Sequence, residues 1–397
     1  MDGQMMEYQL TLPPLLRRAE TYFGDKEIVT RLPDRSFHRY TYRDMARRAK
    51  ELAVALQRLG LERGDRVATL CWNHYPHLEC YFGIPCAGLV LHTLNLRLHP
   101  RELAYIATHA GDRAVIVDES LLPLLDRFRD ETSIEHVLVV ESSYEELLAG
   151  ADADEWRDPR LRESEAAAMC YTTGTTGRPR GVVYSHRSTM LHALGVPFGH
   201  PVSEADVVLP VVPMFHANAW GYPYLAAATG AKLVFPGPHL DPESLLEDFV
   251  QERITWAAGI PTIWHGLLHT LDADPGRWDL SSMNSKRSGI CHFAKSAERR
   301  SRSSSAVTDS SGRTTTHASG RSPQRSSGTA ITAASATDGC ATSAFSRSTE
   351  EIHSPPDLIT SFDRSRICTK PRGWIEQMSP VRNQPSSVQR SASSSES

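Results

Sequence analysis

A loop rich in threonine and glycine is the strongest chemical feature of the sequence. The stretch YTTGTTGRPRGVVYSH, residues 171–186, sets four threonines and three glycines beside two arginines. Glycines let backbone N–H groups approach an anion closely and form a concave nest around it. Threonine hydroxyls donate hydrogen bonds, and arginines bring positive charge to phosphate oxygens. These residue types favour a polyphosphate site over the alternative, a flexible polar hairpin turn.

The loop connects two stretches that look like strands, residues 166–173 and 181–186. Its glycines, Gly174, Gly177 and Gly181, match neither GxxxxGK[ST], the spacing of a Walker loop, nor GxGxxG ahead of a helix. The expected phosphate site is therefore a strand-to-strand loop of another kind.

Helical and strand patterns alternate on both sides of this loop. Residues 41–60 repeat apolar side chains at helical spacing, and Gly60 is expected to stop the helix. Further helical patterns lie at 102–111 and 242–253. Apolar runs without in–out alternation, typical of buried parallel strands, lie at 66–71, 114–118, 136–140, 206–213, 232–237 and 254–260. The pattern predicts an α/β protein with parallel sheets flanked by helices.

The composition of the chain changes near residue 284. The first 284 residues carry 27 Lys+Arg against 38 Asp+Glu, whereas the last 113 carry 16 against 9 and contain 28 serines and one leucine. Such a segment lacks the side chains of a core, so residues 285–397 are expected to form a disordered, Ser/Arg-rich, low-complexity tail. RRSRSSS would suit contact with RNA, but a solvated segment is favoured and no nucleic-acid partner is expected.

Two further features bear on the compartment. No apolar run approaches the roughly 20 residues needed to cross a bilayer, and the N-terminus lacks the basic start and apolar stretch of a secretory signal. The seven cysteines stand singly, which favours reduced thiols. We therefore expect a cytoplasmic protein without a transmembrane segment. The sequence leaves the oligomeric state open.

The threonine-glycine loop resembles [YF]TSGTTGxPKGV, the nucleotide-binding signature of the adenylate-forming, AMP-dependent synthetase superfamily of acyl-CoA synthetases, luciferases and adenylation domains. PMFHANAWG, residues 213–221, is similar to the acyl-site motif of medium- and long-chain fatty-acid–CoA ligases, and GIPT, residues 259–262, to the turn that follows it. The resemblance covers about residues 10–284. It implies the N-terminal part of the synthetase fold over 1–284, truncated and without the C-terminal lid domain.

The resemblance also implies a two-step reaction on small molecules. A fatty-acid carboxylate attacks the α-phosphate of ATP to give an acyl-adenylate and pyrophosphate, and the thiol of CoA then displaces AMP. Mg²⁺ would bridge the phosphates. By resemblance, His216 is the catalytic residue, and Trp220, Gly221 and Gly259 shape the acyl site. The implied phosphate ligands are Thr172, Thr173, Gly174, Thr175, Thr176, Gly177 and Arg180.

Some of these residues, and others near them, could instead have a purely structural role. His216 is one of 17 histidines, but its place in PMFHANAWG favours a functional role. Trp220 and Trp264 are equally suited to a core. His186 is expected to start a helix or to pack, and Cys170 to pack rather than to act as a nucleophile.

Other segments typical of the superfamily are missing. A YGxTE-like segment, a TGD aspartate and a lid lysine do not appear after residue 283. DRSRICTKPRGWI, residues 363–375, is faintly similar to the hinge motif DRxKDxIKxxG; as a hinge it would use Asp363, Arg364 and Lys370. The joint loss of leucine and of motifs suggests a shifted reading frame, and the rival interpretation is a genuine tail. Finding the YGxTE-like segment, the TGD aspartate and the lid lysine in another reading frame would support the frameshift interpretation.

Three functions follow as hypotheses. The first is a fatty-acid–CoA ligase, and the second, in the same class, is an adenylation domain or aryl-CoA ligase. The third is a non-catalytic remnant that binds nucleotide or acyl ligands weakly. PMFHANAWG favours a fatty acyl substrate through resemblance alone, and the length of the acyl chain stays open.

A substitution at Arg180 tests the phosphate site. Arg180 stands where the superfamily signature has lysine, whose compact ammonium differs from a planar guanidinium at a phosphate. We expect Arg180→Lys to keep or raise the affinity for MgATP, measured by isothermal titration calorimetry. Unchanged affinity in Arg180→Ala would remove this residue from the site.

Overall fold

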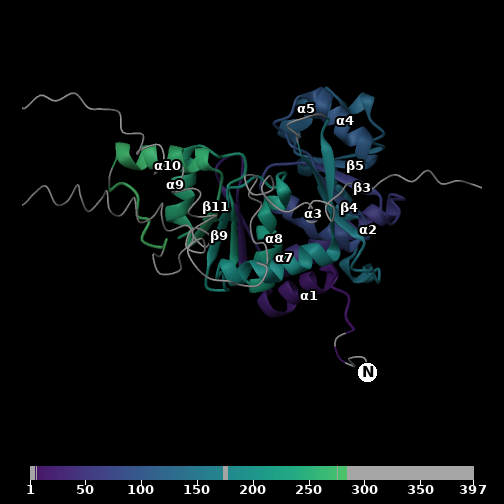
Figure 1. Cartoon of the computed structure of the whole chain (residues 1–397), viewed down its shortest axis with the longest axis horizontal. Helices are drawn as coiled ribbons and strands as arrows, with labels where there is room; N and C mark the ends of the chain where they lie inside the picture. Colours follow the sequence, from purple (N-terminus) through teal and green to yellow (C-terminus); the bar gives the residue numbers. More distant parts are fainter. Residues whose placement is uncertain (1–4, 6, 173–177, 275, 284–397) are drawn as a thin grey trace, which may run out of the picture.

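Two β-sheets and the helices packed against them make up the described part of the chain (Figure 1). The computed structural model describes residues 5, 7–172, 178–274 and 276–283. The expected tail at 285–397 and most of the threonine-glycine loop, residues 173–177, lie outside these ranges.

The first sheet has five strands in the order β11–β9–β10–β1–β2. β1 (Glu27–Arg31) pairs parallel with β10 (Lys232–Phe235) and antiparallel with β2 (Phe37–Thr41). β9 (Val207–Pro210) lies parallel between β10 and β11 (Trp256–Ala258). Strands β9, β10 and β11 lie within the ranges predicted from the sequence, whereas β1 and β2 were not predicted.

The second sheet has six strands in the order β6–β5–β3–β4–β7–β8. Its parallel strands are β3 (Arg66–Leu70), β4 (Val90–Thr93), β5 (Asp112–Val117), β6 (His136–Val139) and β7 (Ala166–Thr172). β8 (Arg180–Ser185) is antiparallel to β7. The two strands expected around the threonine-glycine loop therefore form a hairpin at one end of this sheet.

Helices cover both faces of the second sheet. On β3 and β5, Val67 and Ile116 face the core between the sheets, whereas Ala68 and Val115 face a second core. The helices α4 (Pro100–Ala110) and α5 (Leu122–Leu125) close that second core. This double burial is the reason that the strands read as continuous apolar runs.

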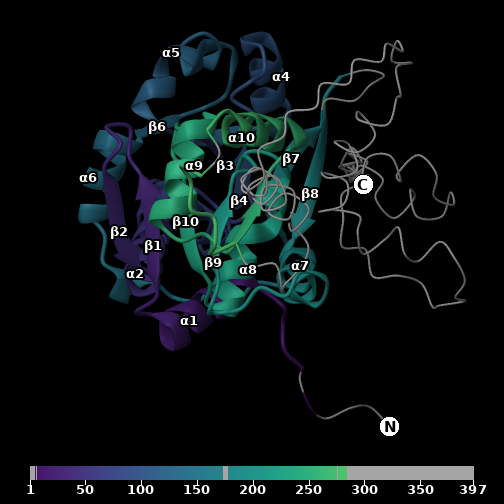
Figure 2. The same ribbon diagram turned by 90° about the vertical axis from the view of Figure 1, so that its left-hand side faces the viewer.

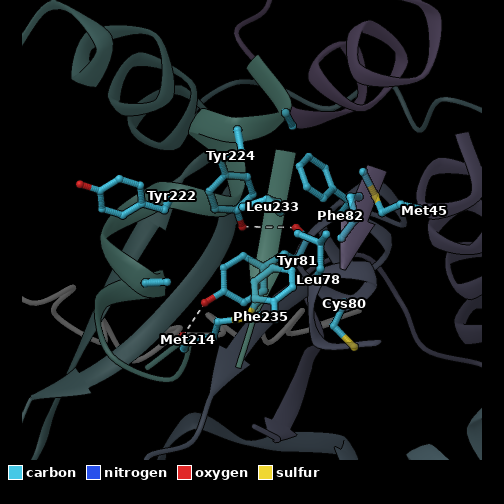
Figure 3. Packing of buried hydrophobic residues seen from close by; sticks show 14 of the residues in the cluster. Met45, Leu78, Cys80, Tyr81, Phe82, Met214, Tyr222, Tyr224, Leu233 and Phe235 are labelled. Atoms are coloured by element: carbon cyan, nitrogen blue, oxygen red, sulfur yellow. Dashed lines mark hydrogen bonds between the residues drawn. The ribbon is translucent and has the colours of Figure 1, made fainter. Parts of the chain in front are cut away.

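Most of the remaining helices lie between or beside the two sheets (Figures 1 and 2). They are α1 (Leu12–Phe23), α2 (Tyr42–Arg58), α3 (Tyr75–Cys86), α6 (Glu145–Ala149), α7 (His186–Gly199), α8 (Tyr222–Thr229), α9 (Pro242–Gln251) and α10 (Pro261–Ala273). Aromatic side chains fill the space between α3 and α8, where Tyr224 packs on Tyr81 and Phe82 with ring centroids 5.5 and 5.4 Å away (Figure 3). The α/β architecture predicted from sequence is confirmed.

The helix predicted at 41–60 is α2, and its ends have the expected signals. Thr41 and Asp44 form a reciprocal cap, since each side chain accepts a hydrogen bond from the other's backbone N–H. The predicted apolar face, from Met45 to Leu56, is buried. Gly60 follows in the left-handed region at φ 80°, which favours glycine.

The strand predicted at 206–213 is wrong in its second half, because β9 ends at Pro210. The side-chain amide of Asn73 donates hydrogen bonds to the carbonyl oxygens of Pro210 and Val212, both at 2.9 Å. These two hydrogen bonds hold the chain where it leaves the strand.

Buried histidines fix the start of α3 on the second sheet. Nδ1 of His77 is 3.0 Å from the carbonyl oxygen of Trp72, and Nε2 is 3.0 Å from Oγ1 of Thr69. The carbonyl can only accept, so Nδ1 carries the proton and Nε2 accepts from the hydroxyl. Burial lowers the pKa of His77 to about 3, so the ring is neutral in the folded protein at pH 7.

Acid is expected to destabilise the fold through His77. Below about pH 6.5 the side chain of His77 is protonated in the unfolded protein but stays neutral in the folded protein. The free energy of unfolding therefore decreases as the pH is lowered, by up to about 1.4 kcal/mol per pH unit. His77→Gln should flatten this slope in urea titrations between about pH 7 and 5. His269→Gln, at an exposed position on α10, should keep it. Equal slopes in the two variants would contradict the assignment.

Candidate active site

The three motifs identified in the sequence follow three strands at their carboxyl ends. β7 leads into the threonine-glycine loop, β9 into PMFHANAWG, and β11 into GIPT. In open α/β sheets, ligands bind outside the carboxyl ends of parallel strands. The topology therefore directs all three motifs toward the region expected of a ligand site.

The hairpin of β7 and β8, which we call the phosphate hairpin after its predicted role, sets a hydroxyl opposite a guanidinium at its stem. Thr172 on β7 and Arg180 on β8 are register partners, and both are exposed. Directly opposed residues of an antiparallel pair project their side chains on the same face. The other predicted phosphate ligands, Thr173 to Gly177, lie outside the described residues.

A contact between side chains joins this hairpin to PMFHANAWG. Sγ of Cys170 is 3.6 Å from Oδ1 of Asn218. Thr172 lies two residues beyond Cys170 on the same strand and so shares its face. The hydroxyl of Thr172 therefore faces the same side as residue 218. Burial raises the pKa of the Cys170 thiol to about 11, in agreement with its expected packing role.

The opposite face of the hairpin is anchored to α4. The hydroxyl of Tyr171 is 2.7 Å from Nδ1 of His109, and the ring of Tyr171 lies 5.2 Å from that of His92. The guanidinium of Arg178 lies 5.5 Å from the ring centroid of Tyr105, also on α4. Arg178 is thus placed with Tyr171, whereas Arg180 shares the face of Thr172.

Asn73 holds the chain between β9 and His216. In addition to its bonds to Pro210 and Val212, its Oδ1 accepts a hydrogen bond from the backbone N of Met214 at 2.8 Å. The side chain is buried, and both its amide donors and its carbonyl acceptor are used. The sequence analysis did not identify Asn73, although a polar residue shortly after a buried strand is a recognisable signal.

Two hydroxyls from the second sheet and from α3 complete this support. Tyr81 donates a hydrogen bond to the carbonyl oxygen of Met214 (Figure 3). Oγ1 of Thr93, at the carboxyl end of β4, donates to the carbonyl oxygen of Phe215 at 3.3 Å. His216 follows directly and is exposed. The predicted catalytic histidine therefore projects from a backbone that buried side chains fix.

The residues after His216 form a left-handed turn. The φ angles of residues 217–220, which are Ala, Asn, Ala and Trp, are 44°, 51°, 49° and 52°, and Gly221 follows at 74°. Left-handed backbone costs an L-residue roughly 1–2 kcal/mol. Such outliers persist only where surrounding structure imposes them, and they concentrate at functional sites. Trp220, half-buried, ends the strained run.

Gly221 is required at its position for two reasons. Its φ is positive, and a Cβ atom there would collide with the imidazole of His192 on α7. Burial, with a smaller contribution from His200, lowers the pKa of His192 and keeps its ring neutral. The sequence did not single out His192, since its proximity to residue 221 arises only from the packing of α7.

The third motif packs against the start of the second. Nε1 of Trp264 donates to the carbonyl oxygen of Gly259 at 2.9 Å, and a Cβ atom on Gly259 would lie 3.5 Å from Cβ of Val211. Trp264 is buried, which agrees with a core role. His186 also takes its expected place: it begins α7, is buried, and accepts a hydrogen bond from the backbone of Leu12.

A buried group of metal-ligand type lies at the carboxyl ends of β3 and β5. Atoms of Cys71, His74 and Asp118 lie within 4.8 Å of one another. Nδ1 of His74 accepts from the backbone N of His77 at 3.1 Å, and Nε2 is 2.6 Å from Asp118, whose other oxygen accepts from the backbone of Trp72. These bonds occupy the ligand atoms of His74 and Asp118 in fixing the start of α3.

No helix in the described ranges is long and apolar enough to cross a bilayer.

A family model described as AMP-binding enzyme matches residues 16–312. The chain belongs to this family. It is 49% identical over 279 residues to a long-chain-fatty-acid–CoA ligase of Thermus thermophilus, a match that covers 68% of this chain and 51% of the relative. It is 40% identical over 284 residues to a medium-chain-fatty-acid–CoA ligase of Ectopseudomonas oleovorans, covering 68% of this chain and 52% of that enzyme. The chain thus spans about half the length of these relatives.

Solved structures agree with this assignment at the level of the fold. A long-chain-fatty-acid-CoA ligase from Archaeoglobus fulgidus superposes with a TM-score of 0.65 at 22% identity, over 72% of this chain and 59% of that one. The N-terminal domain of FACL13 from Mycobacterium tuberculosis superposes with a TM-score of 0.61 at 25% identity, over 70% of this chain and 68% of that one. The predicted resemblance to the N-terminal part of the synthetase fold is confirmed.

Removing the side chain of Asn73 tests how the site is held. Asn73→Ala leaves two carbonyls and one N–H without their partners in a buried region, at a cost of about 1–3 kcal/mol for each unsatisfied group that water cannot reach. We expect a loss of at least about 2 kcal/mol in the free energy of unfolding, measured by urea titration. Asn95→Ala, at a half-buried loop position, is the matched control and should lose less. Equal losses in the two variants would argue against this role.

Proposed function

We propose that this chain binds ATP and a fatty acid as part of a fatty-acid–CoA ligase. The proposed reaction forms an acyl-adenylate and pyrophosphate and then transfers the acyl group to CoA with release of AMP. The observation that carries the proposal is the contact between Cys170 and Asn218, which sets the phosphate hairpin beside the acyl-site motif. The 49% identity to a long-chain ligase supports the choice of a fatty acyl substrate.

In the proposed site, the phosphate hairpin holds the β- and γ-phosphates. Thr172 and Arg180 stand at its stem, and Thr173, Gly174, Thr175, Thr176 and Gly177 form its loop. Mg²⁺ would enter with the nucleotide as a bridge between phosphate oxygens. His216, which is exposed, would donate a hydrogen bond where negative charge develops between carboxylate and α-phosphate. Because the backbone before His216 is fixed, the donor needs little reorganisation.

The acyl chain would lie along the left-handed turn. Trp220 would offer apolar surface, while Gly221 and Gly259 let His192 and Trp264 pack closely against the backbone that borders the chain. His192 closes the far side of Gly221 as a neutral ring, which suits an apolar ligand. The described residues carry no group that we assign to CoA.

The second candidate function is binding without turnover. It is favoured by the change in composition after residue 284, where YGxTE-like, TGD and lid-lysine segments would be expected and a Ser/Arg-rich segment stands. Such a protein would bind MgATP or a fatty acid through the same hairpin and turn. It would not release pyrophosphate.

Pyrophosphate release separates the two functions. We expect the full chain, incubated with MgATP and decanoate, to release pyrophosphate only when both are present, and His216→Ala to lower the rate on the order of a hundredfold. His269→Ala, exposed on α10, is the control and should match the parent rate. MgATP binding without pyrophosphate release would favour the second candidate. Absence of binding of both MgATP and decanoate in calorimetry would contradict both.

A further inference from the structure

A cavity of about 640 Å³ lies at the amino ends of three parallel strands of the second sheet. Gly64 precedes β3, Gly88 precedes β4, and Ala166 is the first residue of β7; all three line the cavity. The predicted phosphate loop leaves the carboxyl end of β7, so the cavity lies at the opposite edge of the sheet. Its volume is within the range of small-molecule sites, roughly 300–1,000 Å³. We call it the amino-edge cavity.

The amino-edge cavity carries an excess of positive charge. Arg63, Arg160 and Arg162 line it together with Glu165, so three cations stand against one anion, a net charge of +2. Nε and Nη2 of Arg63 donate to the two carboxylate oxygens of Glu165 at 2.6 and 2.7 Å, and Nε of Arg162 donates to the same carboxylate at 3.1 Å. These bonds, first of all that from Arg63, lower the pKa of Glu165 to about 2, so the carboxylate is ionised at neutral pH.

Two of the three arginines keep donors for a ligand. Nη1 and Nη2 of Arg162 make no hydrogen bond with any residue that the structure describes, and this side chain is 79% exposed. The guanidinium of Arg160 forms no salt bridge within the described ranges, and it is exposed as well. The other carboxylate nearby, Asp158, is paired with Arg17 at 2.8 Å. A guanidinium has five N–H donors, so most of those on Arg160 and Arg162 face solvent.

The backbone that carries these arginines is held in an unusual conformation. Arg160 has a φ of 50°, in the left-handed region. Its backbone N–H donates to Oδ1 of Asp158 at 3.1 Å, while Nη1 and Nη2 of Arg63 donate to the carbonyl oxygens of Pro159 and Arg160, both at 3.4 Å. Left-handed backbone at a residue other than glycine is costly, persists only where contacts impose it, and concentrates at functional sites such as ligand clamps. Arg63 thus supports the segment from which Arg160 projects.

The remaining lining residues are small or apolar. Val90 and Gly88 are buried, and Ala166 is half-buried. Gly64 and Gly88 have φ angles of 90° and 82°, and the backbone N of Gly64 donates to the carbonyl oxygen of Gly88 at 2.9 Å. The cavity therefore combines a few charged groups with a small apolar wall, as sites for small organic ligands do.

We propose that the amino-edge cavity binds the dianionic phosphate group of a small organic molecule through the guanidinium groups of Arg160 and Arg162. Planar guanidinium donors match phosphate oxygens in pairs. A dianion balances the net charge of +2, and a concave lining suits a compact molecule better than the flat surface of a membrane. This site lies apart from the phosphate hairpin and does not depend on the proposed ligase reaction.

Calorimetry with phenyl phosphate tests this site in the full 397-residue chain. The titration is done at about pH 8, where a phosphate monoester is a dianion. We expect Arg160→Gln/Arg162→Gln to weaken binding by about tenfold or more, because charge-assisted hydrogen bonds are lost. Arg253→Gln, at another exposed arginine with positive φ, is the matched control and should leave the affinity unchanged. Benzenesulfonate, with one negative charge on the same ring, should bind about tenfold more weakly or less.

Arg180→Ala separates this site from the phosphate hairpin and should keep the binding that Arg160→Gln/Arg162→Gln removes. Circular dichroism checks that each variant is folded, and the single variants Arg160→Gln and Arg162→Gln provide further substitutions.

Unchanged affinity in the folded double variant would overturn the proposal. Loss of binding in Arg180→Ala alone would also overturn it, because the ligand would then occupy the hairpin. A parent chain that ignores phenyl phosphate but sediments with phosphatidic-acid vesicles would show a lipid site instead, and a parent that binds neither would have no such site. None of these measurements uses ATP, fatty acid or CoA, so failure of the ligase reaction would not affect them.

Discussion

The described structure depends on one buried side chain, Asn73, which ties the two sheets together at the candidate site. Its amide and carbonyl groups hold the chain that leaves β9, and its backbone oxygen accepts a hydrogen bond from Gly237, just after β10. Asn73 itself follows β3, at the centre of the other sheet. A buried amide is tolerated only when its hydrogen bonds are made, and here each one crosses between the sheets. Asn73 therefore helps to fix the start of the acyl-site motif relative to the second sheet, together with Thr93 and Cys170.

Contacts from neighbouring elements also explain how the strained turn after His216 persists. Four consecutive residues without glycine adopt left-handed backbone before Gly221, at a local cost that no helix or strand propensity offsets. Hydrogen bonds from Tyr81 and Thr93 hold the carbonyls of Met214 and Phe215 immediately before the turn, and Cys170 contacts Asn218 within it. These contacts come from α3, β4 and β7, elements of the second sheet and its inner layer. The strained backbone of the candidate site is thus held in place by contacts from residues outside the turn.

Features that leave a local sequence pattern could be predicted, whereas features that arise from contacts between distant residues could not. Strands β3, β5 and β6 and helix α2 follow from apolar patterns, because burial on both faces or on one face leaves a local signature, whereas β4 was not predicted. The phosphate hairpin follows from its threonines and glycines. The left-handed run at residues 217–220 has no such signature, since Ala and Trp do not favour positive φ. Likewise His192 and Asn73 enter the site through contacts across 29 and 141 positions of the chain, which no local pattern encodes.

Helix α7 connects these features to the exposed surface of the molecule. Its first residue, His186, directly follows the phosphate hairpin and receives a hydrogen bond from the start of α1. Its inner face places His192 against Gly221, and its outer face presents Leu191, Leu194 and Phe198. Packed elements transmit displacement because interiors are dense and resist compression. Helix α7 therefore contacts both strands of the hairpin and the turn after His216, so a displacement of this helix would move both motifs together.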